Sequence, residues 1–374
     1  MERIRNAGMN RRQRAFFILL RSGLWESEVT ELSVFPLSEE EWCDVLHMSE
    51  QQTVQGLLYR GFQHLPLNLF PPKILISRWV AIASSLEKEY CRFLTNMEAT
   101  GRILKTMGVT PILKKGLAVA QFYEHPAMRI NGDIDWFVGS KDVLLTLRKK
   151  LIAKGYFTEK HSDGSISFDY DGTEIELHHQ LIDLEQPSHR KITKRFLEFH
   201  PLTIGVTSNG TNDEITYVPA PILTLVMLNA HLMKHAFTVG VGLRHFCDMA
   251  RAYHSLYGKY DINILSNTYD LTGLRKWSGL LHQFLIHFLG MPTHELPSLP
   301  SPKSRDTQRL LQQVLHDGNF GLHTQKWQKA PIKKRNRWRT VEKIVHRLPI
   351  SLRYAPGEIF YKILSLSNIS SQYL

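Results

Sequence analysis

A run of seven residues, GDIDWFV at positions 132–138, places two carboxylates one residue apart in an otherwise apolar stretch. Its β-branched and aromatic residues are typical of a buried β-strand. Side chains of a strand alternate between its faces, so Asp133 and Asp135 share one face and Ile134 and Trp136 share the other. Two adjacent carboxylates repel one another and lose hydration free energy on burial. The run therefore predicts a strand with one core face and one face that carries chemistry.

A divalent cation bound by both carboxylates would remove both costs. Mg²⁺ prefers oxygen ligands, commonly one or two carboxylates together with substrate phosphates and waters. A site of this kind usually needs a third acid on a neighbouring strand. The segment TEIELHHQL, residues 173–181, alternates in the same way, and Glu176 lies at the centre of its polar face. We therefore expect Asp133, Asp135 and Glu176 to bind Mg²⁺ or Mn²⁺.

A phosphate-binding turn should precede these acids. The stretch ILKKGLAVA, residues 112–120, places Gly116 between a short strand and a short helix. Free backbone N–H groups at such a turn can face an anion. Lys115 is expected to neutralise phosphate charge there, and the alternative is a surface lysine beside Lys114.

These motifs together resemble the nucleotidyltransferase superfamily, which has a DNA polymerase β-like fold. The chain is most similar to a branch of uncharacterised nucleotidyltransferases with Lys-Gly at the turn, an arginine, Gly-Asp-Ile-Asp at the first acids and Glu-x-His at the third. The matching residues are Lys115-Gly116, Arg129, Gly132-Asp133-Ile134-Asp135 and Glu176-Leu177-His178. The branch also tends to carry a helical His-x-x-Lys-His and then a basic-then-acidic helix. Its counterparts here are His231-Leu232-Met233-Lys234-His235, Arg244 and Asp248. The resemblance covers about residues 100–255.

The resemblance implies transfer of a nucleoside monophosphate from a nucleoside triphosphate, with ATP expected first, to a hydroxyl acceptor with release of pyrophosphate. It makes Asp133, Asp135 and Glu176 the catalytic residues. The residues expected at the nucleotide are Lys115, Gly116, Arg129, Gly132 and Lys234.

One position departs from the pattern. The superfamily usually has serine after the glycine of the turn, where the hydroxyl contacts phosphate, whereas this chain has Leu117. The acceptor is open between a small molecule and a protein side chain. An RNA end, or a non-catalytic nucleotide-binding or interaction protein on the same fold, is the alternative.

Several candidate residues also have a plain structural interpretation. Glu176 could lie on an exposed strand face, and Asp169 and Asp171 are rival acids, although an Asp-Gly turn explains Asp171. Arg129 could be a loop arginine paired with a nearby acid. The face of the His231–His235 segment could pack against the sheet rather than bind ligand. The spacing resembles a zinc helix, but the glutamate of the H-E-x-x-H motif is absent and we expect no zinc.

Hydrophobic periodicity predicts an α+β fold, a small mixed-sheet nucleotidyltransferase domain flanked by helical regions. Helices are expected over 10–24, 38–62, 72–107, 116–123 and 141–154. Strands are expected over 111–114, 132–138, 155–160, 165–170 and 173–181. The expected regions are an N-terminal helical region at 1–108, a nucleotidyltransferase core at 109–218 and a C-terminal helical region with a basic tail at 219–374.

Composition limits the classes of protein further. The net charge of +11 attracts polyanions and permits nucleic acid without requiring it. Three isolated cysteines form no disulfide framework, which favours the cytoplasm, and the longest apolar run, 222–228, is too short to span a membrane. The basic segment 326–347 has nine lysines and arginines and one acid. A solvated helix or a surface for polyanions or anionic membranes would explain it, and residues 357–370 could be a docking helix.

Overall fold

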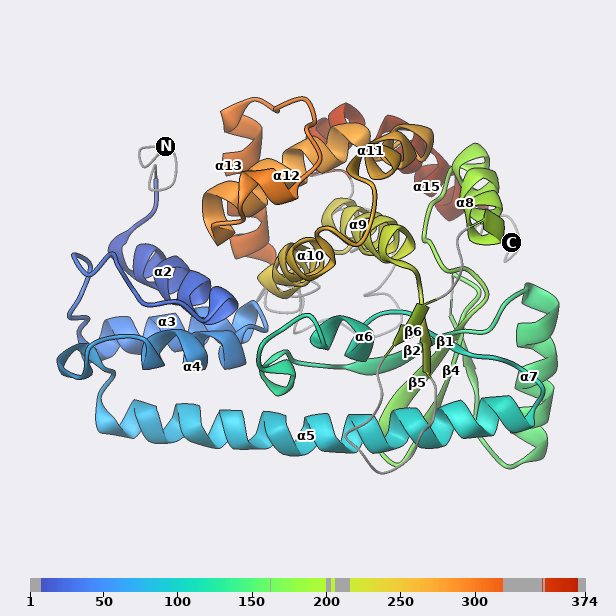
Figure 1. The fold of residues 1–374 in the computed structure, drawn as a ribbon, viewed down its shortest axis with the longest axis horizontal. Helices are drawn as coiled ribbons and strands as arrows, with labels where there is room; N and C mark the ends of the chain where they lie inside the picture. The colour runs from blue at the N-terminus through green and yellow to red at the C-terminus, as the bar shows by residue number, and fades with distance from the viewer. Residues whose placement is uncertain are drawn as a thin grey trace.

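The computed structural model describes residues 8–161, 163–199, 203–205, 216–318, 345 and 347–368. These residues form one mixed β-sheet with helices on both sides of it (Figure 1). The expected α+β class is therefore confirmed. The basic segment 326–347 lies outside the described residues except for Val345 and Arg347.

The sheet has seven strands in the order β3-β4-β5-β2-β1-β7-β6. Strand β2 is central, antiparallel to β1 and parallel to β5. The turn between β4 and β5 is the expected Asp-Gly hairpin, because Asp171 and Gly172 have φ values of 48° and 68°. The strands are β1 Ile112–Leu113, β2 Asp133–Phe137, β3 Glu159–Lys160, β4 Ile166–Tyr170, β5 Thr173–His178, β6 Thr203–Gly205 and β7 Thr216–Val218. The last two strands, and α8 at Pro187–Phe199, had no sequence prediction of their own.

The apolar face of the sheet packs on α5, Lys73–Thr106, and α7, Lys141–Ala153. Figure 1 shows α5 running along this side of the sheet. Trp136 of β2 lies against Gly101 of α5, and its indole Nε1 donates to Thr100 Oγ1 at 3.2 Å. This contact fixes which face of β2 is core, so the two aspartates of β2 must face the other way.

The N-terminal helices are α2 Arg11–Trp25, α3 Glu39–Gln51 and α4 Gln55–Gln63. The prediction of one helix over 38–62 was wrong, because the chain breaks at Gln52–Val54. Thr53 there has a left-handed φ of 53°, and the Gln52 side chain accepts from the Leu243 amide at 3.0 Å and donates to the Val314 carbonyl at 3.1 Å. The turn is held by these distant contacts, which no local pattern reveals.

The remaining helices cover the polar face of the sheet and extend away from it (Figure 1). They are α6 Leu117–Ala120, α9 Pro221–Phe237, α10 Leu243–Leu256, α11 Ile262–Leu271, α12 Arg275–Leu289, α13 Ser304–Asp317 and α15 Pro356–Asn368. One hydrophobic core joins α2–α4 to α9, α10 and α12. The division of the chain at residues 108 and 218 stays a prediction. None of the helices in the described part of the chain is long and apolar enough to cross a bilayer.

Candidate active site

The two acidic strands are direct neighbours in parallel register. Asp133 pairs with Glu174, and Asp135 pairs with Glu176. Paired residues of adjacent strands lie on the same face, about 4.8 Å apart in the hydrogen-bonding direction. The structure thus brings Asp133, Asp135 and Glu176 to one face of the sheet.

The tightest acidic group is Asp135, Glu176 and His178. Their candidate ligand atoms all lie within 4.8 Å of one another, and within the described ranges this is the one group of three or more such residues so arranged. The Nε2 atom of His178 is 2.8 Å from Asp135 Oδ1 and 3.5 Å from Glu176 Oε2. Two carboxylates with one imidazole fit a divalent cation such as Mn²⁺ or, through the oxygens, Mg²⁺.

Lys115 neutralises the aspartates from the opposite side. Its Nζ lies 2.7 Å from Asp135 Oδ2 and 3.6 Å from Asp133 Oδ2. Burial disfavours the lysine charge, but the attraction of Asp133 and Asp135 outweighs it and raises the pKa of Lys115. The pKa of fully buried Asp135 is lowered for the reciprocal reason, because Lys115 and His178 overcome its desolvation. The face therefore holds charged groups at the edge of the space where an ionic ligand could bind.

Asp133 differs from Asp135. Its side chain is 36% exposed and stands outside the three-residue group that could hold a metal. Burial and the neighbouring Asp135 raise the pKa of Asp133. Its role as a metal ligand stays a prediction.

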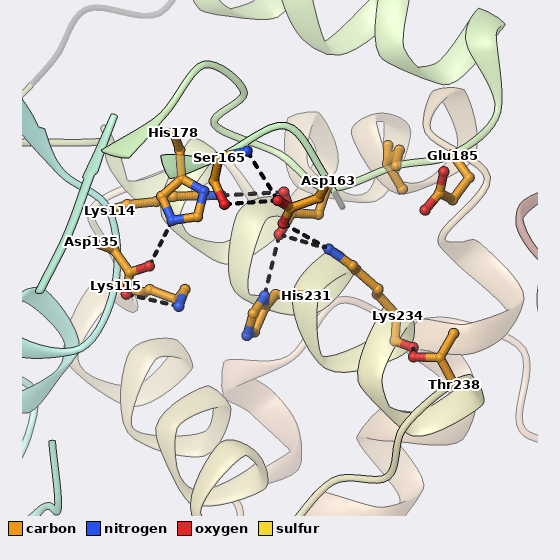
Figure 2. Close-up of polar contacts among 12 residues, drawn as sticks. Lys114, Lys115, Asp135, Asp163, Ser165, His178, Glu185, His231, Lys234 and Thr238 are labelled. Atoms are coloured by element: carbon orange, nitrogen blue, oxygen red, sulfur yellow. Dashed lines mark hydrogen bonds and ion pairs between the residues drawn. The ribbon is translucent and has the colours of Figure 1, made fainter. Parts of the chain in front are cut away.

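A cavity of about 550 Å³, here called the main cavity, opens between this face and helices α9 and α10. Asp135 lies just behind its lining, in contact with Lys115 and His178. The predicted residues that line it are Lys115, Gly116, Arg129, Gly132, Asp133, Glu176 and Lys234. The volume is that of an ordinary small-molecule site. Figure 2 shows Lys115 and His178 converging on Asp135 while Lys234 extends from α9 toward Asp163.

The glycine turn differs from the expected phosphate cradle. Gly116 has φ +61°, a conformation that favours glycine. The amides of Ala118 and Val119 donate to the carbonyls of Lys115 and Gly116. The turn therefore offers a phosphate at most the amides of Gly116 and Leu117. The Leu117 side chain is 1% exposed and belongs to the core under the sheet.

Arg129 forms a buried ion pair with Asp248. Its Nε and Nη2 donate to the two oxygens of Asp248 at 3.0 and 2.8 Å, and Tyr123 donates to the same carboxylate at 2.8 Å. Its Nη1 donates to Asn131 Oδ1 at 2.7 Å. The residue borders the main cavity, but its donors are engaged in fixing the loop before β2.

Sequence reasoning missed Asp183, which forms a second charged centre at the main cavity. Its carboxylate lies 3.2 Å from Lys114 Nζ, 3.3 Å from His231 Nδ1 and 3.8 Å from Lys234 Nζ. The charges of Lys114 and Lys234 and the hydrogen bond with His231 hold the pKa of Asp183 well below its ordinary value despite burial. A single acid in the loop after β5 has no spacing that marks it, so only the tertiary contact reveals it.

Two further residues that line the main cavity are His231 of α9 and Arg244 of α10. Burial, with the nearby Arg129, lowers the pKa of Arg244 to about 10, and its Nη1 donates to the Ile130 carbonyl at 2.8 Å. Burial also lowers the pKa of His231 to about 4, so this imidazole is neutral at pH 7. The His-x-x-Lys-His helix predicted from the resemblance thus faces the acids across the cavity.

Carboxylates on the adjacent parallel strands β2 and β5, with Lys115 and a glycine turn after β1 beside the same cavity, fit a phosphoryl-transfer site. The chain matches the model of the uncharacterised nucleotidyltransferase family over residues 38–290, and it belongs to that family. The match extends beyond the stretch 100–255 on which the sequence resemblance rested. No curated protein and no solved structure matches the chain.

Proposed function

We propose that the protein is a metal-dependent nucleotidyltransferase. It moves a nucleoside monophosphate from a nucleoside triphosphate, ATP first among them, to a hydroxyl acceptor and releases pyrophosphate. The observation that carries the proposal is the register of β2 and β5, which puts Asp135 beside Glu176 at the wall of the main cavity. Family membership supports the same class of reaction. Cytoplasmic localisation is part of the proposal.

The acidic and basic residues at the main cavity have different proposed roles. Asp135 and Glu176, with Asp133 at the cavity edge, would hold Mg²⁺ or Mn²⁺, which when bound supplies positive charge to the phosphates. Lys115, 2.7 Å from Asp135 in this structure, would turn to the triphosphate and neutralise the leaving pyrophosphate. Gly116, Gly132 and Lys234 border the space for the nucleotide, and Arg129 shapes it.

Glu176 is the residue best placed to take the acceptor proton. The hydrogen bond to His178 lowers the pKa of Glu176 in spite of burial, so the carboxylate is ionised at neutral pH. The acceptor oxygen would bond to the α-phosphorus in line with the departing pyrophosphate oxygen.

The test is pyrophosphate release with Mg²⁺ or Mn²⁺ and each of the four nucleoside triphosphates, alone and with a cell extract as acceptor source. Asp135→Asn should reduce release by about 100-fold or more. Asp169→Asn is the matched control, because Asp169 is an exposed acid on the neighbouring strand β4. Equal loss in both variants, or release that survives Asp135→Asn, would contradict the proposal.

One observation favours a second candidate, nucleotide binding without transfer. Asp135 is already neutralised by Lys115 and His178, and the serine of the superfamily turn is replaced by buried Leu117. Such a protein would bind a metal–nucleotide complex, measured by calorimetry, and release no pyrophosphate with any acceptor.

A further inference from the structure

A second cavity adjoins the main one on the far side of the acidic group. It measures about 240 Å³ and is here called the side cavity; its lining includes Ser165, Gln180, Arg190, Lys362 and Ser365. Four residues line both cavities and form the partition between them, namely Asp163, His178, Asp183 and Lys234. The two cavities are therefore direct neighbours that share these four side chains.

One residue of the partition, His178, contacts the proposed metal ligands Asp135 and Glu176. His178 contacts Asp135 at 2.8 Å and faces both cavities. Ser165, from the side cavity, donates to Glu176 Oε1 at 2.5 Å and to Asp163 Oδ1 at 2.7 Å. In Figure 2, Asp163 lies between the group of Asp135, Lys115 and His178 and the side chain of Glu185. A molecule in the side cavity thus meets Ser165 and His178, two residues that contact Glu176.

In-line displacement needs this kind of two-sided approach. The attacking and leaving oxygens lie roughly on opposite sides of the phosphorus. If the triphosphate lies along Lys115 in the main cavity, the acceptor oxygen must arrive from the other side of the acidic group, between the shared side chains. The side cavity borders this group through His178 and Ser165.

The charges of the side cavity indicate the class of acceptor. Its three cations each face carboxylates: Arg190 and Lys362 lie 2.9 Å from Glu185, and Lys234 lies 3.8 Å from Asp183. The Ser165 hydroxyl proton is directed to carboxylates and that of Ser365 to the Lys362 carbonyl, so these two oxygens meet a ligand as acceptors, together with the Gln180 amide. Such a lining favours a neutral molecule rich in hydroxyl groups over an anion, and the volume suits one sugar-sized ring.

We propose that the side cavity binds the acceptor, and that the acceptor is a small neutral polyhydroxylated molecule of monosaccharide or cyclitol type. This inference rests on the proposed transferase function. One hydroxyl oxygen of the acceptor forms the new bond to the α-phosphorus. The bond from that phosphorus to the bridging oxygen breaks, and pyrophosphate leaves with the electron pair. The hydroxyl proton passes to Glu176 and then to solvent.

The test blocks the side cavity and leaves the main cavity intact. Ser365→Trp on α15 fills the space, and Ser77→Trp at an exposed position of α5 is the matched control. Transfer from α-labelled ATP is measured to glucose and to myo-inositol, with glucose 6-phosphate and a serine-containing peptide as competing acceptor classes. Nucleotide affinity is measured by calorimetry on the same proteins.

We expect wild type and Ser77→Trp to label the neutral polyols in preference to the phosphate ester and the peptide. Ser365→Trp should reduce this transfer by about 100-fold, with the nucleotide Kd within about twofold of wild type because that site is separate. Gln180→Ala, a smaller change, should raise the KM for the polyol more than it lowers kcat.

Transfer to the polyols that Ser365→Trp and Gln180→Ala leave unchanged would overturn the inference. Preferred labelling of the peptide or of the phosphate ester would overturn it as well, while pyrophosphate release that depends on Asp135 would leave the proposed function standing. Absence of both nucleotide binding and pyrophosphate release would instead reject the proposed function, and the acceptor site with it.

Discussion

Lys115 and Asp135 form the ion pair at the centre of the candidate site, with Nζ 2.7 Å from Oδ2. The aspartate side chain is fully buried, and the lysine side chain is 17% exposed. The same carboxylate is an expected metal ligand, so the lysine stands where a metal or a metal-bound phosphate would supply charge. In the absence of a ligand, the ammonium group of Lys115 compensates the buried negative charge of Asp135.

Replacing Lys115 with methionine should therefore make folding stability depend on metal. In EDTA, Lys115→Met leaves Asp135 with less positive charge and should lower the free energy of unfolding by about 3 kcal/mol. Mg²⁺ or Mn²⁺ should then raise the melting temperature of the variant more than that of wild type, because a ligand that binds only the folded state stabilises it. Thermal melts with and without metal measure this.

The control for that experiment is Lys73→Met at the exposed start of α5. It should melt like wild type under both conditions. An equal metal response in wild type and Lys115→Met would mean that the lysine and the metal do not compete for the same carboxylate.

Leu117→Ser restores the residue that the superfamily usually has after the glycine, and it should not create a phosphate contact. Leu117 is almost fully buried in the core under the sheet. The change should cost about 3 kcal/mol of unfolding free energy, as for other large-to-small core substitutions. Calorimetry should show no gain in nucleotide affinity.

Ala118→Ser, at the next and partly exposed position, is the matched control and should cost little. A stable Leu117→Ser protein with tighter nucleotide binding would show that the turn can present this side chain to the cavity.

Asp248→Asn tests the structural role of Arg129. The pair is bidentate and buried, so the neutral side chain would leave a cation without its partner. We expect a loss of about 3 kcal/mol in urea unfolding. Asp270→Asn removes the partner of Arg275 in an exposed pair and should cost less than about 1 kcal/mol. Similar small losses in both variants would mean that Arg129 is available to a ligand.

The sequence alone could predict which side chains of each acidic strand share a face, because side chains alternate along a strand. Alternation along residues 133–138 and 173–181 predicted the shared face of each strand, and the structure confirms both faces as far as Phe137 and His178, where the strands end. Parallel pairing of Asp135 with Glu176 is a relation between distant segments. The need for a third acid on a neighbouring strand predicted Glu176, but no local pattern predicted this register.

The rest of the site depends on tertiary packing. His178 was placed beside Glu176 by the Glu-x-His motif, but its contact with Asp135 needs the pairing of β2 with β5. Asp183 becomes central because α9 brings His231 and Lys234 to it. The break in the predicted helix 38–62 likewise follows from the bonds of Gln52 to α10 and α13, which local propensity does not encode.

Buried neutral histidines should make the fold sensitive to acid. Burial lowers the pKa of His282 to about 3, and one hydrogen bond of 2.9 Å joins its Nε2 to the Tyr253 hydroxyl. In the unfolded chain histidine has a pKa of about 6.5. Because the folded-state pKa is the lower one, this contribution to stability is complete above pH 6.5. It is lost as pH falls from 6.5 toward 3, since the unfolded state binds the proton more readily there.

The expected slope from His282 alone is about 1.4 kcal/mol per pH unit over that window. His282→Gln keeps a polar group beside Tyr253 and removes the titration, so its stability measured in urea from pH 8 to pH 5 should fall less steeply than that of wild type. His47→Gln on the exposed face of α3 is the matched control and should leave the slope unchanged. Parallel curves for wild type and His282→Gln would show that His282 is protonated in the folded protein or reached by water, and the acid sensitivity would then have to come from the other buried histidines, among them His231.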